Sequence, residues 1–332
     1  MPATPFPTGA GRARWLVAVV LLAAACSVPG PTASMDAAPA GLVPAGAASL
    51  TASPRPLPRV LFGVTADDVS PLGQLVAGAR HLARVPVTRL YFDAALGPSA
   101  YAAAVRALRP VSYLMGELLD SSDAASMSTA AYARRVSAYL SALGSQVDIW
   151  EVGNEVNGNW AGPYPAVAAK LTAGYRLVAA RHLRGALTLY YNVGCGDGPG
   201  ELDPLAFSRR YVPAAVRDGL GYVFLSYYED QCGGHRPSAG TWTSYFKALH
   251  ALYPRARLGF GEVGLSVPAT AATAAAAEAL IRHYYGLRVR LPYYAGGYFW
   301  WYYAEDCLPY RTRPLWQAVN AGFTAEARVL GE

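Results

Sequence analysis

Short apolar runs alternate with longer helical segments along most of this chain, and the alternation limits the fold more than any other feature. Each run has seven or eight residues, many of them Val, Leu, Phe and Tyr. The segments between them, such as 128–143 and 166–182, repeat apolar residues every three or four positions, as helices packed on a sheet do. The strand-like runs lie at 59–65, 87–93, 110–116, 147–153, 187–193, 222–228, 257–263 and 296–303.

Eight such units predict a (β/α)8 barrel, formed as one domain by residues 58–332. Most strand starts are about 35 residues apart, which is the size of one strand with its helix. An open, doubly wound sheet also alternates strands and helices, but it usually carries a G-x-G-x-x-G turn after its first strand. The stretch LFGVTADD at that place has no such turn, and the glycine-rich stretch 192–203 has Pro199 where the third glycine belongs, so we interpret it as a loop.

The amino terminus is typical of an export signal. Arg12 and Arg14 precede the apolar stretch WLVAVVLLAAAC, which has the length of a signal-peptide core and predicts a signal peptide over 1–26. The small residues before Cys26 resemble a lipoprotein cleavage site with lipid-modified Cys26; the alternative is an ordinary signal peptide that contains a cysteine. Residues 27–57 are rich in Ala, Pro, Ser and Gly and predict a disordered linker. We therefore expect an exported protein, secreted or held to the cell envelope by a lipid on Cys26 alone.

Composition excludes several classes of protein. Hydrophobic residues make up 53% and charged residues 15% of the 332, which leaves enough apolar surface for a large core and excludes a disordered chain. The net charge of +6 comes from scattered arginines, so nucleic-acid binding is not expected. A metal site or a serine nucleophile elbow is not expected either, because H-x-H, H-E-x-x-H and G-x-S-x-G are all missing from the sequence. We expect no cofactor.

Two glutamates follow strand-like runs at places where a barrel gathers its catalytic groups. Asn154 and Glu155 come after the fourth run, and Glu262 lies at the end of the seventh. The 107 residues from Glu155 to Glu262 correspond to about three strand-helix units, which places the two carboxylates across the barrel mouth. Two carboxylates that face each other over a cleft are the equipment for glycoside hydrolysis.

These motifs resemble the retaining glycoside hydrolases of clan A, a barrel superfamily that includes cellulases, mannanases and xylosidases. The resemblance rests on WEVGNE, on GFGEVG about a hundred residues later, and on the aromatic eighth run, and it covers residues 58–325. It implies a carbohydrate substrate, Glu155 as general acid/base, Glu262 as nucleophile, and Asn154 as a hydrogen-bond partner of the sugar 2-hydroxyl.

The resemblance extends to two further side chains. In VTRLYFD, residues 87–93, a period of two places Arg89 on the same side as Tyr91 and Asp93. Clan members often hold an arginine of strand two against the nucleophile, which implies contact between Arg89 and Glu262. The His-x-Tyr of their sixth strand is Ser226-Tyr227-Tyr228 here, so Tyr228 matches and the histidine is replaced.

Three tryptophans and one more glutamate have open assignments. Trp300 and Trp301 point opposite ways on the eighth run, so only one of them can form a platform for a sugar ring. Trp160 either stacks on a sugar ring or packs on a helix. Glu151 either points away from the cleft or lies deep in the barrel as a structural acid.

The cysteines and the reaction complete the expectations. If Cys26 is lipidated, three cysteines remain, and Cys195 and Cys232 lie on neighbouring loops, so a disulfide is expected between them, with Cys307 left over. The predicted function is an exported glycosidase, acting as a monomer on a polysaccharide or oligosaccharide. The alternative is a saccharide-binding surface lipoprotein that keeps the cleft without turnover.

Overall fold

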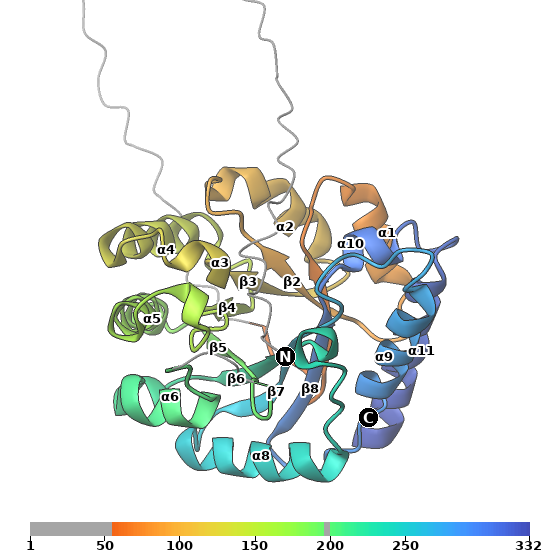
Figure 1. The fold of residues 1–332 in the computed structure, drawn as a ribbon. Helices are drawn as coiled ribbons and strands as arrows, with labels where there is room; N and C mark the ends of the chain where they lie inside the picture. Colours follow the sequence, from red (N-terminus) through yellow and green to blue (C-terminus); the bar gives the residue numbers. More distant parts are fainter. Residues whose placement is uncertain (1–54, 196–199) are drawn as a thin grey trace, which may run out of the picture. The chain divides into compact units, whose positions relative to one another are not determined.

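The computed structural model describes residues 55–195 and 200–332 as a closed barrel of eight parallel strands in chain order (Figure 1). The predicted (β/α)8 barrel is thereby confirmed, and the open doubly wound sheet is wrong. The strands are β1 (Leu61–Ala66), β2 (Val87–Tyr91), β3 (Tyr113–Glu117), β4 (Ile149–Glu151), β5 (Gly185–Tyr190), β6 (Tyr222–Tyr227), β7 (Arg257–Val263) and β8 (Tyr294–Trp300).

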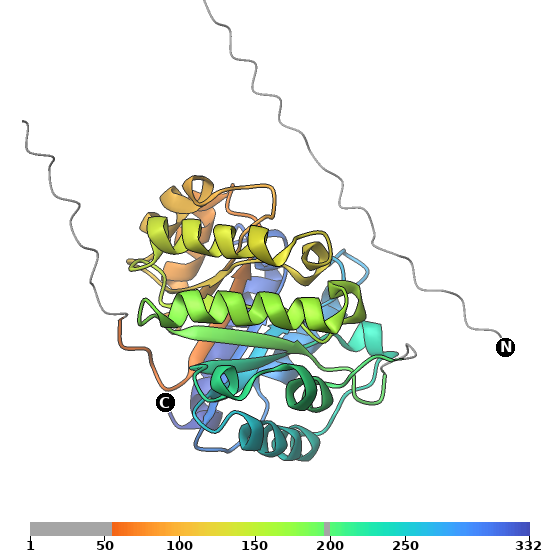
Figure 2. The ribbon, with the colours of Figure 1, turned by 90° about the vertical axis from the view of Figure 1, so that its left-hand side faces the viewer.

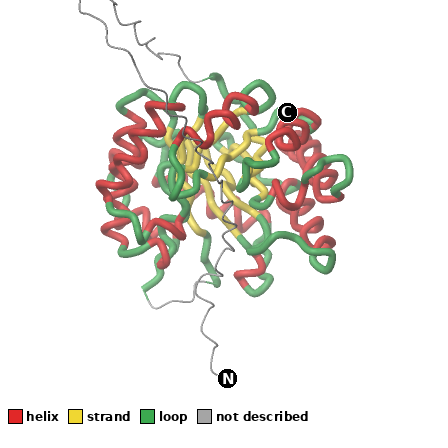
Figure 3. The backbone as a smooth tube through the Cα atoms, turned by 90° about the horizontal axis from the view of Figure 1, so that it is seen from above, coloured by secondary structure: helices red, strands yellow, loops and turns green. Residues whose placement is uncertain are grey.

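Helices surround the strands on the outside, as Figure 3 shows in red around yellow. The α-helices are α1 (Leu72–His81), α2 (Ala102–Leu108), α3 (Ser121–Ala124), α4 (Thr129–Leu143), α5 (Tyr164–Ala179), α6 (Pro204–Tyr211), α7 (Ala214–Arg217), α8 (Ala239–Leu252), α9 (Ala274–Tyr285), α10 (Tyr303–Cys307) and α11 (Pro314–Leu330). Three 3₁₀ turns are η1 (Pro98–Tyr101), η2 (Asn159–Ala161) and η3 (Glu229–Cys232). Figure 2 shows α4 and α5 packed side by side on the barrel wall. In the described ranges, no helix is long and apolar enough to cross a membrane.

The expected signal peptide, Cys26 and most of the expected linker lie outside the described residues. Residues 55–57, which we assigned to the linker, belong to the barrel domain instead. The Arg55 guanidinium is held by the Asp148 carboxylate and donates 2.9 Å hydrogen bonds to the carbonyls of Arg109 and Ser112, at the amino-terminal end of the barrel. A composition of Pro, Arg and Leu gave no sign of these contacts, because they depend on loops distant in sequence.

The barrel interior changes from apolar to polar along most of the strands. At the amino-terminal end, inward-facing side chains form an apolar floor that consists of Leu61, Val87, Met115, Ile149, Ala186, Tyr222, Phe224, Ala295 and Phe299. Further along six of the strands, in the same inward phase, lie buried polar groups: Arg89, Glu117, Glu151, Thr188 and Ser226 two residues on, and Thr65 four residues on. A larger apolar core fills the space between the strands and the helices. This arrangement places the polar layer directly beneath the carboxyl ends of the strands.

Strand β8 is irregular in its pairing, but its side chains still alternate between the barrel interior and the helices. Its pairing with both neighbours shifts register, and Gly296 and Gly297 have φ of 70° and 102°. A Cβ atom on Gly297 would lie 2.3 Å from the Phe260 carbonyl oxygen, so this position requires glycine. Tyr298 and Phe299 also have positive φ, 63° and 33°; Phe299 faces the barrel interior and Trp300 faces the helices.

Candidate active site

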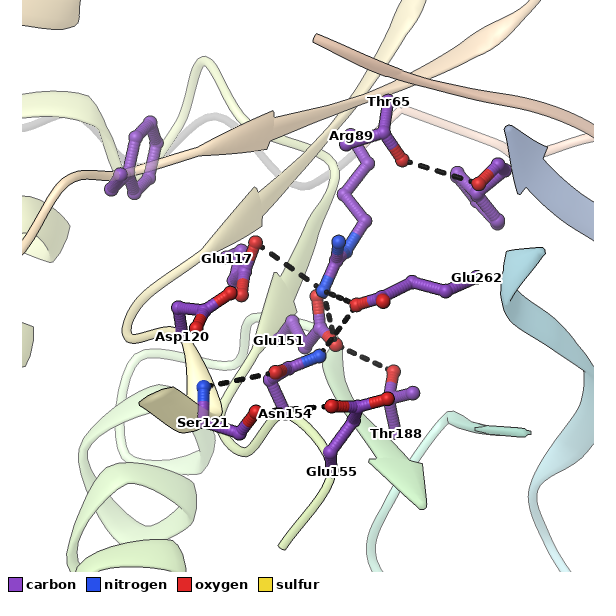
Figure 4. A network of polar contacts seen from close by, with 12 residues as sticks. Thr65, Arg89, Glu117, Asp120, Ser121, Glu151, Asn154, Glu155, Thr188 and Glu262 are labelled. Carbon is purple, nitrogen blue, oxygen red and sulfur yellow. Dashed lines mark hydrogen bonds and ion pairs between the residues drawn. The ribbon is translucent and has the colours of Figure 1, made fainter. Parts of the chain in front are cut away.

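The two predicted glutamates lie at the carboxyl ends of β4 and β7 and face a common polar cluster (Figure 4). Strand β4 ends at Glu151, two residues before the predicted run does, because the chain turns at Asn154 and Glu155. Glu155 has φ of 42°, a conformation that non-glycine residues rarely adopt, and its carbonyl accepts a 2.8 Å hydrogen bond from the Gly158 amide. Strained backbone of this kind is concentrated at functional sites.

The turn directs the Glu155 carboxyl group to two serine hydroxyls. Ser226 Oγ of β6 donates to Glu155 Oε1 over 2.5 Å, and Ser121 Oγ at the start of α3 donates to Oε2 over 3.0 Å. Ser226 stands where the clan has a histidine, and sequence analysis recorded that replacement without a role for it. Ser121 was not predicted at all, because it comes from a loop after β3 whose path no strand pattern fixes.

Three donors surround the Glu262 carboxyl group; the sequence placed all three side chains at the site, but it assigned Asn154 to the sugar 2-hydroxyl and not to Glu262. Arg89 Nη2 lies 2.8 Å and Asn154 Nδ2 lies 2.6 Å from Oε1, while the Tyr228 hydroxyl donates to Oε2 over 2.7 Å. These side chains come from β2, from the turn after β4 and from the end of β6, so three distant segments converge on one carboxyl group. The expected contact between Arg89 and Glu262 is present.

Arg89 also serves two other carboxyl groups that sequence analysis did not link to it. Its Nε and Nη2 donate to Glu151 over 2.6 and 3.0 Å, and Nη2 lies 3.3 Å from Glu117 Oε2. Thr188 Oγ1 donates to Glu151 over 2.5 Å. Glu151 is therefore the deep, hydrogen-bonded acid, the second of the two readings that the sequence allowed. The signal for Glu117 was its inward phase, two residues after Met115 on β3.

One guanidinium cannot neutralise three fully buried carboxylates, and removal of such groups from water favours their neutral forms. Neither oxygen of Glu117 has a hydrogen-bond partner among the described residues. Burial raises the pKa of Glu117 well above its ordinary value, against the pull of Arg89, and the negative charges of Asp120, Glu151 and Glu262 add to the rise. We therefore treat Glu117 as protonated.

Glu155 and Glu262 have different surroundings and different affinities for a proton. Burial, followed by the charge of Glu262, raises the pKa of Glu155 to about 8, and the hydrogen bonds from Ser226 and Ser121 oppose the rise. Burial also raises the pKa of Glu262, to about 7, although Arg89 and the Tyr228 hydroxyl lower it. The last proton shared by the two therefore belongs to Glu155, the group with serine donors and no cation.

The structure separates Trp300, the last residue of β8, from Trp301, which follows it. Trp301 packs with Tyr91 and Tyr228 and lies under the Arg89 guanidinium, whose carbon is 5.1 Å from the ring centroid. Trp300 is only 1% exposed in the outer core and donates its indole N–H to Asp306 over 2.8 Å. Trp300 therefore does not face the site, and its assignment to sugar binding is corrected by the alternation along β8.

Trp160 lies in η2 at the edge of the site and is 39% exposed. Its indole N–H donates to Ser121 Oγ over 2.9 Å, and its ring meets that of Tyr190 edge to face at 5.0 Å.

The cysteines lie away from the carboxylates. A disulfide joins Cys195, after β5, to Cys232 in η3, after β6, so the expected pair is the one that forms. Cys307 is a buried thiol. Among residues 55–195 and 200–332, no group of three or more His, Cys, Asp or Glu side chains is placed to hold a metal ion.

Comparison with known proteins finds similarity in structure alone. No protein-family model matches the chain, and no curated protein does. A glycoside hydrolase family 10 xylanase from Bispora sp. MEY-1 aligns with a TM-score of 0.53 at 16% identity, over 72% of this chain and 82% of the xylanase. A family 1 β-glucosidase from Exiguobacterium antarcticum aligns with a TM-score of 0.53 at 11% identity, over 79% and 87%.

A third similar structure is a glycoside hydrolase family 5 enzyme from Prevotella bryantii, with a TM-score of 0.50 at 14% identity, over 80% of this chain and 94% of that one. Sequence identities this low are informative about the fold only. The chain is a (β/α)8 barrel of the kind that these glycoside hydrolases share.

Proposed function

We propose that the chain is a glycoside hydrolase that cleaves a polysaccharide or oligosaccharide with retention of configuration at the anomeric carbon. Glu262 is the nucleophile and Glu155 is the general acid/base. The observation that carries this proposal is the unequal support of the two carboxyl groups: a guanidinium, an amide and a phenol serve Glu262, whereas two serine hydroxyls serve Glu155. Such a pair separates the roles of anion and proton donor.

In the first step, the Glu262 carboxylate attacks the anomeric carbon while the bond to the leaving oxygen breaks. Glu155 gives its proton to that oxygen. In the second step, a water molecule attacks the same carbon, the bond to Glu262 breaks, and Glu155 takes the proton of the water. The donors around Glu262 favour its anionic form before the first step and after the second.

Asn154 and Trp301 are assigned to the sugar that becomes attached to Glu262. Asn154 donates one amide hydrogen to Glu262, and we assign the second to the sugar 2-hydroxyl. Trp301, beside Arg89 and Tyr228, is the aromatic wall of the same subsite. Trp160 is assigned to substrate as well, and export with anchoring through Cys26 stays a prediction of the sequence.

A substrate screen tests this proposal. The purified protein is assayed against a panel of aryl glycosides and bacterial exopolysaccharides, and the first product is examined by proton NMR before it mutarotates. We expect turnover with a first product of the same anomeric configuration as the substrate. A first product of inverted configuration contradicts the mechanism, and saccharide binding without turnover on any member of the panel favours the non-catalytic alternative.

A further inference from the structure

A chain of hydrogen bonds runs from the molecular surface to the proposed proton donor. The Trp160 indole N–H donates to Ser121 Oγ over 2.9 Å, and Ser121 Oγ donates to Glu155 Oε2 over 3.0 Å. Trp160 is 39% exposed, whereas Ser121 is buried. One end of the chain is therefore accessible to a ligand, and the other end is the carboxyl group that transfers the proton.

The chemistry of the three groups fixes the direction of these hydrogen bonds. An indole nitrogen is a donor only, so Ser121 Oγ must accept from it. The single hydroxyl hydrogen of Ser121 is then free for Glu155 Oε2. Glu155 Oε2 accepts from Ser121 Oγ and Glu155 Oε1 accepts from Ser226 Oγ, so Ser121 holds one of the two carboxyl oxygens in place. Trp160 thus fixes the hydroxyl group that orients one oxygen of the Glu155 carboxyl group.

Trp160 is held in place on several sides, as a binding platform requires. A Cβ atom on Gly158 would lie 2.5 to 2.8 Å from three atoms of the indole ring, so the ring rests against the backbone of that glycine. Tyr190 contacts the ring edge to face. Among the large exposed hydrophobic residues of the described ranges, Trp160 is the aromatic one; the others are Val85, Leu96, Val193 and Val267. A rigid aromatic ring that already has its N–H bonded offers its exposed surface to a ligand at low entropic cost.

The position of Trp160 relative to the two carboxyl groups defines which part of a substrate it meets. A general acid lies beside the leaving oxygen, whereas the nucleophile attacks from the opposite side of the anomeric carbon. Trp160 is bonded through Ser121 to the acid, and Trp301 lies with Arg89 on the side of Glu262. The two aromatic walls therefore belong to the two sides of the scissile bond.

We propose that Trp160 is the platform for a sugar ring on the leaving-group side, and that Ser121 couples its occupancy to the orientation of Glu155. This inference rests on the proposed function and specifies its substrate class: the leaving group is itself a saccharide, not a small alcohol or a phenol. A ring stacked on Trp160 fixes the indole, the indole fixes the Ser121 hydroxyl, and the hydroxyl holds Oε2 of Glu155 as an acceptor. Trp160 and Ser121 are positioning residues for the proton transfer.

Kinetics on two kinds of substrate test the coupling. Trp160→Ala is expected to lower kcat/KM on an oligosaccharide at least about tenfold more than on the 2,4-dinitrophenyl glycoside of the same sugar, since the phenolate needs neither the platform nor the proton. Trp160→Phe keeps a ring and loses the N–H, so KM should change little while kcat on the oligosaccharide falls. Equal losses on both substrates for Trp160→Ala contradict the proposal.

Two further variants separate coupling from simple structural damage. Ser121→Ala removes a donor that lowers the pKa of Glu155, so the alkaline limb of the pH profile should move upward, which general damage does not produce. Gly158→Ala displaces the indole ring and should act in the same direction as Trp160→Ala. Val85→Ala, an exposed residue just before β2, is the control and should leave both substrates unaffected. An unmoved alkaline limb in Ser121→Ala overturns the link to Glu155.

Binding measurements test whether Trp160 binds a saccharide even if the proposed hydrolysis is wrong. In calorimetric titration of the full chain with cellohexaose, xylohexaose and mannohexaose, at least one of the three should bind. Its affinity for Trp160→Ala should be about tenfold weaker than for wild type, and its affinity for Trp160→Phe should be within about twofold of wild type. Wild-type affinity in Trp160→Ala, or no binding of any of the three, overturns the platform. Loss of binding in Trp160→Ala without any turnover by the wild type supports the platform and rejects the hydrolase.

Discussion

Asn154 and Glu262 are 108 residues apart in the chain and are joined by a 2.6 Å hydrogen bond from Nδ2 to Oε1. The orientation of the amide is fixed, because Asn154 Oδ1 accepts a 3.0 Å hydrogen bond from the Ser121 amide. Ser121 also donates to Glu155, so one asparagine and one serine connect the two proposed catalytic carboxyl groups. The roles of these groups lead to testable expectations about pH and stability.

Arg89→Met should move the acidic limb of the activity profile upward by about one pH unit or more. Glu262 must be ionised to attack, and Arg89 lowers its pKa, so loss of the cation raises the pKa and delays ionisation. Because the variant leaves buried carboxyl groups without their partner, the free energy of unfolding should fall by about 3–5 kcal/mol. The pH dependence of kcat/KM and urea unfolding measure the two effects.

Arg236→Met is the matched control, since Arg236 pairs with Glu229 in η3, outside the Arg89 cluster. It should lower stability without a shift of the acidic limb. An acidic limb that stays in place in Arg89→Met shows that Arg89 does not support the nucleophile.

Glu117→Gln should stabilise the protein at pH 8 and have little effect at pH 5. The pKa of Glu117 is raised from 4.5, so above that pH the folded protein holds a proton that the unfolded chain has released, and stability falls as pH rises. For each pH unit above 4.5 and below the raised pKa of Glu117, the free energy of unfolding falls by about 1.4 kcal/mol. A glutamine at this position has no such loss. The melting temperature of Glu117→Gln minus that of wild type should be larger at pH 8 than at pH 5, by about 2 °C or more.

Glu278→Gln on α9 provides the comparison, because Glu278 is a surface residue paired with Arg282. Its effect on melting temperature should be similar at both pH values. If Glu117→Gln behaves in the same way, Glu117 is ionised in the folded protein and the charge balance around Arg89 is wrong.

Ser226→Ala should move the alkaline limb upward by about half to one pH unit. The alkaline limb reports loss of the Glu155 proton; burial and the charge of Glu262 raise the pKa of Glu155, and the Ser226 hydrogen bond lowers it. Tyr228→Phe removes a donor from Glu262 and should move the acidic limb instead. A Ser226→Ala variant that shifts only the acidic limb contradicts the assignment of Ser226 to Glu155.

Much of this site was predictable because its residues lie at strand ends or follow the period of a strand. Glu155, Glu262 and Asn154 follow apolar runs, and Arg89 is in the inward phase of β2. Such patterns give the end of the barrel and the face of the strand, and these two facts place a side chain in the cleft.

Sequence analysis missed some residues of the site because their positions depend on contacts between strands and on loop paths, which the hydrophobic period of a strand does not show. Glu117 approaches Arg89 to 3.3 Å although the pairing of β2 with β3 sets Glu117 opposite Tyr91, so the period of one strand does not reveal this contact. Ser121 reaches Glu155 from a loop, and loop paths are not periodic. The choice between Trp300 and Trp301 needed one residue of known direction on β8: Ala295 and Phe299 face the barrel interior, and Trp301 follows Phe299 by two residues.

Azide rescue with a 2,4-dinitrophenyl glycoside tests the central assignment most directly. In Glu155→Ala, Glu262 should still displace the phenolate, which leaves without a proton, and azide should attack the glycosyl enzyme without a general base. Added azide should therefore raise turnover by about tenfold or more and yield a glycosyl azide of retained configuration, and Glu262→Ala should form no such product. A retained glycosyl azide from Glu262→Ala, with none from Glu155→Ala, would show that the two roles are reversed.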